Sequence, residues 1–199
     1  MKRKLINPNN LFIMTARSAY ECHNDVTKTI SLLDPTSYYS TAFKNNENNI
    51  VRFFEDEETL SFNHKLPNLM DIHAILEFVD KIKTDDIVII HCEAGRSRST
   101  AMAIGCLIYS GLSVEQAVEK VFEIRPKAIP NELILRLFEF ELNLEEDEIK
   151  NFVHKKYRKN DMHFNWDMKK QFEMKDDNDD LDYYLQYLTK INSIKTTVL

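Results

Sequence analysis

The 199-residue chain has little cysteine, no long apolar run and no excess of positive charge. Its three cysteines, Cys22, Cys92 and Cys106, form an odd set without repeated spacing. This excludes a disulfide-stapled fold and favours a reducing compartment, so we expect a cytoplasmic protein. No apolar run approaches the ~20 residues of a membrane span, and the basic N-terminus lacks the apolar stretch of a signal peptide. The net charge of −6 argues against general nucleic-acid binding.

Histidines at metal-ligand spacing are also missing. His64, His73, His154 and His163 do not combine with acids or cysteines in such a pattern, so we expect neither a metal nor another cofactor. Hydrophobic residues make up 43% of the chain. That content suffices for one well-buried α/β domain with an appendage, whereas two full domains would be cramped.

The most informative segment is residues 87–100, in which a β-branched strand runs into Cys92 and an apolar helix begins just beyond Arg98. A tight loop between a strand and a helix leaves several backbone N–H groups, from Glu93 to Arg98, without intrahelical partners. They converge on one spot, where the helix dipole also favours an anion. The segment therefore predicts a phosphate-binding loop formed by Glu93, Ala94, Gly95, Arg96, Ser97 and Arg98.

A cysteine beneath such a loop is a candidate nucleophile. The positive field of the helix N-terminus stabilises the thiolate of Cys92, which then needs no separate base. The planar fork of Arg98 can bind two phosphoryl oxygens at once, which lysine cannot do. Gly95 allows a close backbone approach or a left-handed conformation. We expect Ser99 to offer its hydroxyl to the leaving sulfur, and His91 to fix the loop by hydrogen bonding and to add positive charge.

Two motifs resemble a known family. Residues 91–99 match the HCxxGxxR[S/T] signature of the cysteine-dependent protein tyrosine phosphatase superfamily, in the form typical of its dual-specificity branch. Residues 125–131, RPKAIPN, are similar to a segment of small bacterial and phage-type members. The resemblance covers the chain from about residue 11 to about residue 144. It implies a metal-free, two-step hydrolysis through a phosphocysteine intermediate.

The resemblance also implies an aspartate that protonates the leaving oxygen from a loop upstream of the cysteine. The corresponding window, residues 50–60, is a strand that runs into an acidic cluster. We select Asp56, because it resembles the second acid of the family segment and because crowded like charges help to keep one acid protonated. Glu55 and Glu57 remain alternatives.

The substrate is less well defined by the sequence. The loop lacks the lysines that the resemblance associates with phosphoinositide substrates, so a phosphorylated protein fits best, with phosphotyrosine first and phosphoserine or phosphothreonine as further options. A second guanidinium, from Arg96 at the rim of the pocket, would instead favour extra negative charge, as in a nucleotide, an RNA end or a doubly phosphorylated peptide. A phosphate-binding module without turnover is a further alternative.

Strands and helices alternate along the chain, which predicts an α/β fold with a central, mostly parallel, twisted sheet of four to five strands flanked by helices. We expect strands at 11–14, 28–33 (stopped by Asp34 and Pro35), 50–54 and 87–90, and helices at 68–83, 99–109, 113–124 and 131–144. Residues 1–144 would form the catalytic domain. Residues 145–199 would be a charged helical extension, with Leu181, Tyr184, Leu185 and Leu188 at helical spacing, that binds a partner or self-associates.

Overall fold

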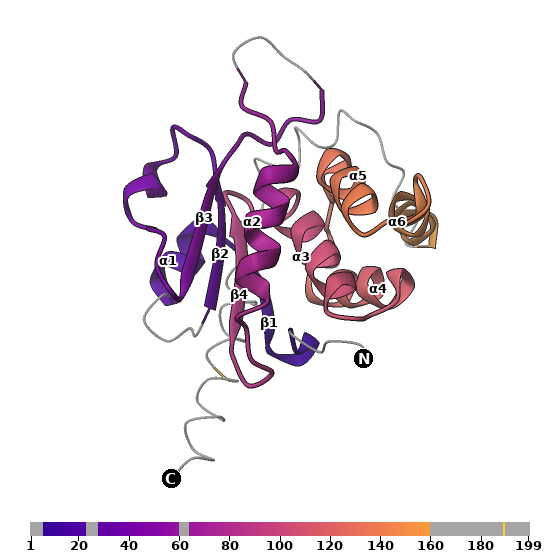
Figure 1. Ribbon diagram of the computed structural model, residues 1–199, viewed down its shortest axis with the longest axis horizontal. Helices are drawn as coiled ribbons and strands as arrows, with labels where there is room; N and C mark the ends of the chain where they lie inside the picture. Colours follow the sequence, from indigo (N-terminus) through magenta and orange to yellow (C-terminus); the bar gives the residue numbers. More distant parts are fainter. Residues whose placement is uncertain (1–5, 23–27, 60–63, 160–188, 190–199) are drawn as a thin grey trace.

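The computed structural model describes residues 6–22, 28–59, 64–159 and 189. These include a parallel sheet of four strands in the order β1-β4-β2-β3 (Figure 1). The strands are β1 (Leu11–Thr15), β2 (Lys28–Leu33), β3 (Asn49–Phe53) and β4 (Val88–Cys92). All neighbouring strands pair in parallel, so their carboxyl ends lie at one edge of the sheet. The predicted α/β class and parallel sheet are confirmed.

The strand β4 lies inside the sheet, between β1 and β2. All five of its residues are buried, which is typical of a strand covered on both faces. Successive side chains of a strand point to opposite faces of the sheet. Accordingly, Ile90 and Cys92 belong to the larger of two hydrophobic clusters, whereas Ile89 belongs to the smaller one.

The two clusters correspond to two layers of helices. The helix α1 (Ala16–Cys22) and the segment that contains Phe43 cover one face of the sheet, together with the short 3₁₀ helix η2 (Tyr38–Thr41). The larger cluster lies on the other face and involves the five helices α2 (Leu69–Val79), α3 (Arg98–Tyr109), α4 (Val114–Ile124), α5 (Glu132–Glu141) and α6 (Glu148–Lys159) (Figure 1). A further 3₁₀ helix, η1 (Pro8–Asn10), precedes β1.

The helix ends follow local capping chemistry. Ser113 and Gln116 form a reciprocal capping box at the start of α4, and Asn68 and Asp71 form another at the start of α2. The helix expected over 68–83 ends earlier, with Asp80 as its C-cap. Helix α3 is buried along almost its whole length, and Cys106 within it is a fully buried core residue.

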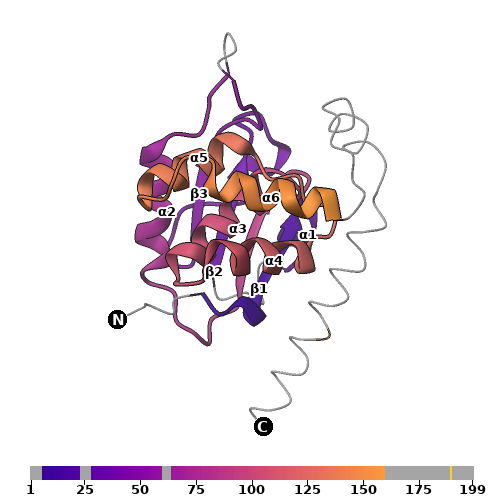
Figure 2. The same ribbon diagram turned by 90° about the vertical axis from the view of Figure 1, so that its right-hand side faces the viewer.

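Helix α6 lies beyond the domain boundary expected at residue 144, yet it packs against α4 and α5 (Figure 2). Its Ile149, Val153 and Tyr157 are buried in the larger cluster. Glu139 of α5 is itself buried, and its carboxylate accepts hydrogen bonds from the backbone N–H groups of Asp147, Ile149 and Lys150. The boundary at 144 therefore stays a prediction, and the helical pattern expected at 181–188 lies outside the described residues.

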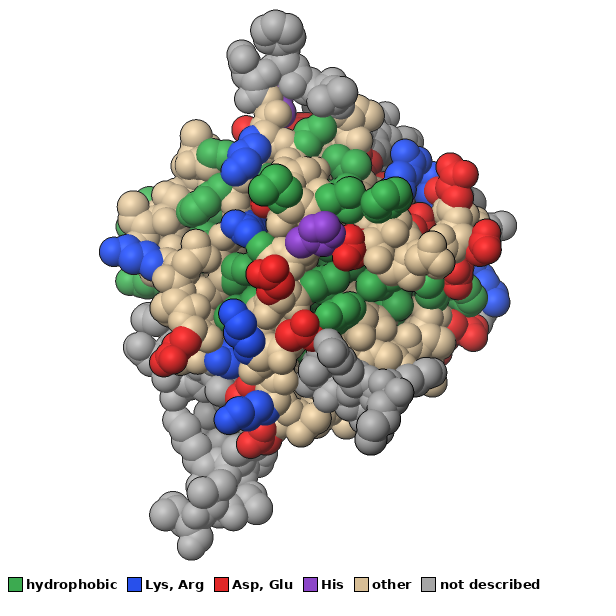
Figure 3. All heavy atoms as spheres, in the orientation of Figure 1, with side chains coloured by type: hydrophobic (Ala, Val, Ile, Leu, Met, Phe, Trp, Pro, Cys, Tyr) green, Lys and Arg blue, Asp and Glu red, His purple; other side chains and the backbone are tan. Residues whose placement is uncertain are grey.

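Acidic and basic side chains are interspersed on the face of the molecule drawn in Figure 3, with hydrophobic side chains among them. On this face, neither sign of charge dominates. Within the described ranges, no helix is both long and apolar enough to cross a membrane.

Candidate active site

The loop of residues 93–97 joins β4 to α3 at the carboxyl edge of the sheet. Gly95 has a φ of +66°, a left-handed conformation that other residues adopt at a cost. A Cβ at this position would lie 2.6 Å from the backbone carbonyl carbon of Met14. The predicted need for glycine thus has two physical causes, the backbone conformation and the close approach of the loop to the end of β1.

Residues 125–131 form hydrogen bonds with the backbone carbonyl groups of the loop. The buried Arg125 donates from Nε to the carbonyl of Gly95 (3.1 Å) and from Nη2 to that of Ala94 (3.4 Å). The backbone N–H of Ile129 donates to the carbonyl of Arg96 (2.9 Å). Because the C=O and N–H of one peptide point in opposite directions, these contacts turn the loop's N–H groups away from residues 125–131.

Cys92 and Ser99 meet beneath this loop. The sulfur of Cys92 lies 3.3 Å from the hydroxyl oxygen of Ser99, in the first turn of α3, and both side chains are buried. This is the contact expected of a hydroxyl that assists sulfur as a leaving group, although the role itself stays a prediction.

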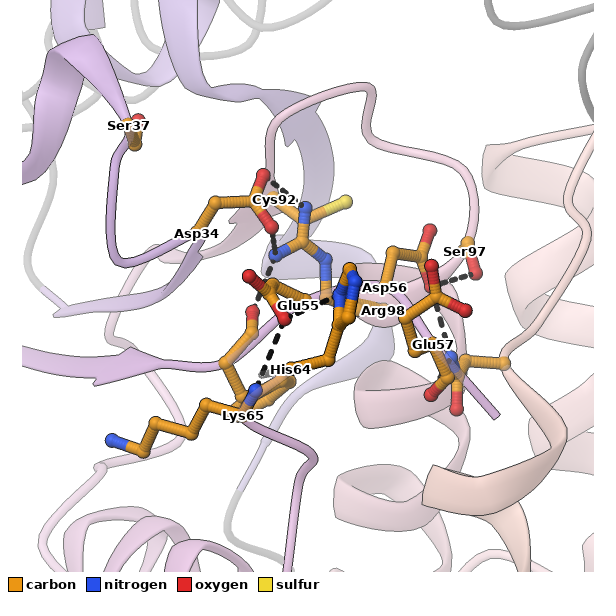
Figure 4. Close-up of polar contacts among 12 residues, drawn as sticks. Asp34, Ser37, Glu55, Asp56, Glu57, His64, Lys65, Cys92, Ser97 and Arg98 are labelled. Carbon is orange, nitrogen blue, oxygen red and sulfur yellow. Dashed lines mark hydrogen bonds and ion pairs between the residues drawn. The ribbon is translucent and has the colours of Figure 1, made fainter. Parts of the chain in front are cut away.

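Arg98 is 3% exposed and is bound by two other segments of the chain (Figure 4). Its Nη1 donates to Asp34 Oδ1 (3.0 Å) and to the carbonyl of Phe54 (2.7 Å), and its Nη2 donates to Asp34 Oδ2 (3.2 Å). Burial opposes the charge of the guanidinium, but the negative charges of Cys92, Asp56 and Asp34 raise the pKa of Arg98 above its ordinary value. Arg98 is therefore a cation throughout the physiological range.

In the acidic segment 55–58, Asp56 forms hydrogen bonds with the loop and with the start of α5. Its Oδ1 accepts hydrogen bonds from the hydroxyl of Ser97 (2.7 Å) and from Nδ2 of Asn131 (2.9 Å). The carboxylate of Glu55 instead accepts from the backbone N–H of Lys65 (3.0 Å) and lies 2.7 Å from His64 Nδ1 (Figure 4). The geometry thus favours Asp56 over Glu55 as the acid beside the loop.

The next two acids, Glu57 and Glu58, attach the acidic segment to the start of α5. The backbone carbonyl of Glu57 accepts from Asn131 Nδ2 (3.4 Å), and Oε1 of Glu58 accepts from the backbone N–H of Glu132 (3.1 Å). Asn131 also caps α5 by accepting from the N–H of Ile134. One asparagine therefore links the start of α5 to the acidic segment.

His91 differs from the sequence expectation. Its Nε2 lies 2.7 Å from the hydroxyl of Ser31, which in turn donates to Asn49 Oδ1 (3.1 Å). The ring is fully buried, and this desolvation lowers the pKa of His91 to about 3. The imidazole is consequently neutral at neutral pH. The side chain does form a hydrogen bond, but to Ser31 of β2 rather than to the loop, and the expected addition of positive charge is wrong.

Arg96 also differs from expectation, because it is only 9% exposed. Its side chain is therefore more enclosed than the expected position at the rim of the pocket. The recruitment of extra negative charge by Arg96 stays a prediction. Within the loop, Glu93 and Ala94 are partly exposed, while Gly95 and Ser97 are buried. Across the described part of the chain, no group of three or more His, Cys, Asp and Glu residues is arranged to hold a metal ion.

Sequence reasoning missed two residues of this site. In the sequence, Asp34 marks only the end of a strand, and Arg125 only the end of a helix. A signal for Asp34 was available, since a carboxylate directly after a parallel strand lies at the same sheet edge as Cys92. A comparable signal for Arg125 was its place in the RPKAIPN segment, which carries part of the family resemblance.

Comparisons with known proteins show similarity to phosphatases. The family model of the dual specificity phosphatase catalytic domain matches residues 11–143. The human tyrosine phosphatase-like serine/threonine/tyrosine-interacting protein has a similar solved structure, with a TM-score of 0.52, 19% sequence identity, and coverage of 68% of this chain and 92% of that chain. A comparison with curated proteins gave no match.

Two further solved structures are similar at lower scores. The PTP-2 phosphatase of Cydia pomonella has a TM-score of 0.49 and 23% identity, over 70% of this chain and 90% of that chain. The phosphatase domain of Yvh1 from Chaetomium thermophilum has a TM-score of 0.46 and 23% identity, over 67% of this chain and 90% of that chain.

Proposed function

Because this chain belongs to the dual specificity phosphatase family, we propose that it hydrolyses phosphate monoesters on proteins through a phosphocysteine formed at Cys92. One observation carries the proposal. The hydrogen bond between Asp56 and Ser97, 41 positions apart, brings an acid to the loop that surrounds the thiol. A nucleophile, a phosphate-binding arginine and a proton donor then lie within one site.

In the first step, the thiolate of Cys92 attacks phosphorus, so that an S–P bond forms while the ester P–O bond breaks. The leaving oxygen takes a proton from Asp56. In the second step, water attacks the phosphocysteine and gives a proton to the Asp56 carboxylate. The S–P bond breaks, the thiolate leaves with a hydrogen bond from Ser99, and inorganic phosphate is released.

Arg98 and the backbone N–H groups of the loop stabilise the negative charge on the equatorial oxygens during both steps. No step requires a metal, since the charge is balanced by the guanidinium and the loop. His91 contributes through its hydrogen bond to Ser31 rather than through charge, because its ring is neutral.

A phosphorylated protein is favoured over a polyanionic substrate by the charges around the site. Asp34 and Asp56 act on Arg98, and Glu55, Glu57 and Glu58 occupy the adjacent segment. A phosphoinositide or an RNA 5′-triphosphate would bring further negative charge towards these acids, which is repulsive. Phosphotyrosine, with phosphoserine and phosphothreonine as further substrates, adds a single phosphoryl group.

The proposal is tested by measuring turnover of a small aryl phosphate without added metal. Cys92→Ser should abolish turnover and Arg98→Ala should reduce it strongly, whereas Arg136→Ala, which removes an exposed arginine of α5, should leave it unchanged. Undiminished turnover in Cys92→Ser would refute the mechanism. Capture of a phosphopeptide without turnover by the unmodified protein would favour a binding module instead.

The substrate class is tested by comparing rates on a phosphotyrosine peptide, a phosphothreonine peptide, a phosphoinositide and an RNA 5′-triphosphate. We expect the peptides to be preferred, and a faster rate on either polyanion would contradict the assignment. The cytoplasmic location and the partner-binding or self-associating role of residues 145–199 stay predictions.

A further inference from the structure

We propose that Asp34 is a positioning residue of this reaction, holding the Arg98 guanidinium so that one defined edge meets the phosphoryl group. The proposal rests on the proposed phosphatase function. It is carried by the bidentate contact of the Asp34 carboxylate with Nη1 and Nη2, at 3.0 and 3.2 Å. Figure 4 shows this carboxylate facing the end of the guanidinium.

The donors of Arg98 divide into two groups. A guanidinium carries five N–H bonds in one plane. Asp34 takes one from each terminal nitrogen, and the carbonyl of Phe54 takes the other one from Nη1 (2.7 Å). The remaining two, from Nε and Nη2, lie parallel along one side of the group, where they match two oxygens of a phosphoryl group.

The Nε atom supports this division, because it is buried and has no hydrogen-bond partner among the described residues. Leaving a buried donor unsatisfied costs free energy, and more so in a charged group. A phosphoryl oxygen would satisfy it. Asp34 therefore does not compete with the substrate for Arg98, since it binds the Nη1/Nη2 edge and leaves the N–H bonds of the neighbouring Nε/Nη2 edge free for the phosphoryl group.

The fold explains why both acceptors stand where they do. Asp34 directly follows β2, the neighbour of β4 in the sheet, and Phe54 directly follows β3. The backbone N–H of Phe54 donates to the carbonyl of Leu33 (3.0 Å), which ties the two strand ends together. Two adjacent strand ends thus form a rigid acceptor pair for the arginine that begins α3.

The variant Asp34→Asn tests the proposal in the full chain. It removes the charge and one acceptor, so Arg98 should lose its fixed orientation. We expect kcat on an aryl phosphate to fall on the order of 10- to 100-fold, with KM changed by less than about threefold. Inhibition by orthovanadate, which forms a five-coordinate adduct with a thiolate, should weaken with kcat/KM, whereas inhibition by inorganic phosphate should change little.

A double-mutant cycle separates positioning from a general structural role. Lysine cannot present a fork, so in an Arg98→Lys background the change Asp34→Asn should alter kcat by less than about twofold. Asp80→Asn serves as the control for loss of one negative charge. Asp80 is the C-cap of α2, and its carboxylate accepts a hydrogen bond from the hydroxyl of Tyr109 (3.0 Å). An equal loss in both backgrounds, with a lowered unfolding temperature, would overturn the proposal. If the unmodified protein turned over no phosphate ester, the proposed function would fail, and orthovanadate binding would still decide the role of Asp34.

Discussion

Replacing Asp56 by asparagine isolates proton transfer from the docking of the acidic segment. Asp56 Oδ1 accepts from Ser97 at 2.7 Å and from Asn131 at 2.9 Å. The amide oxygen of an asparagine can accept the same two hydrogen bonds in nearly the same volume. The variant should therefore keep the segment in place while removing the proton that the leaving oxygen needs.

The size of the effect depends on the leaving group. General acid catalysis by a positioned side chain is worth roughly 10²- to 10⁴-fold, or about 3 to 5 kcal/mol of activation free energy. An alkyl phosphate, whose leaving alkoxide is unstable, should lose this full amount in Asp56→Asn. An activated aryl phosphate, whose phenoxide leaves readily, should lose much less.

The assay is kcat/KM across a series of phosphate esters with leaving groups of increasing basicity. Asp56→Asn should steepen the dependence on basicity, whereas Glu55→Gln and Glu57→Gln should leave it unchanged. Thermal unfolding of each variant checks that the fold is retained. An unaltered dependence in Asp56→Asn, together with a steeper one in either glutamine variant, would refute the assignment and move the role to that glutamate.

Three further predictions concern the loop, the core and pH. Gly95→Ala should reduce both kcat and the free energy of unfolding, because its Cβ would lie 2.6 Å from the Met14 backbone, in the loop itself. Gly105→Ala, which overpacks Phe138 away from the loop, should cost about 1 to 3 kcal/mol of stability with kcat retained. Measuring kcat and denaturant unfolding for both variants checks this contrast. Truncation after residue 144 removes the buried side chains of α6, each worth about 1.5 to 3 kcal/mol, so the unfolding temperature should drop; an unchanged value would support the boundary expected from the sequence. Because burial lowers the pKa of His91 from 6.5 to about 3, the unfolded chain binds a proton between these pH values that the folded chain does not bind. The free energy of unfolding should therefore fall as the pH decreases from 6.5 towards 3. Denaturation measured as a function of pH checks this, and His91→Asn should remove the contribution.

Features encoded by neighbouring residues could be predicted from the sequence. The strand before Cys92, the loop and the helix that begins at Arg98 are consecutive, so their hydrogen-bonding needs follow from local geometry. The helix expected at 113–124 is equally local, and the structure contains it as α4 with Ser113 as its N-cap. Strand alternation and apolar spacing similarly predicted the parallel sheet.

Burial could not be predicted in the same way. Arg96 lies within the loop, where the sequence suggested an exposed rim position, yet its side chain is enclosed by the folded chain. His91 was expected to carry positive charge, but complete burial keeps it neutral. Both outcomes depend on how much water reaches a side chain, and the neighbours that exclude water come from distant segments.

The sequence alone therefore predicted the candidate nucleophile, its loop and the family, because these depend on residues close to one another along the chain. Tertiary structure decided which acid faces the loop and what holds Arg98. Asp34 and Arg98 are 64 positions apart, and they meet only because β2 is the neighbour of β4 in the sheet. Such a contact is set by strand order and packing, which are properties of the whole domain rather than of a local motif.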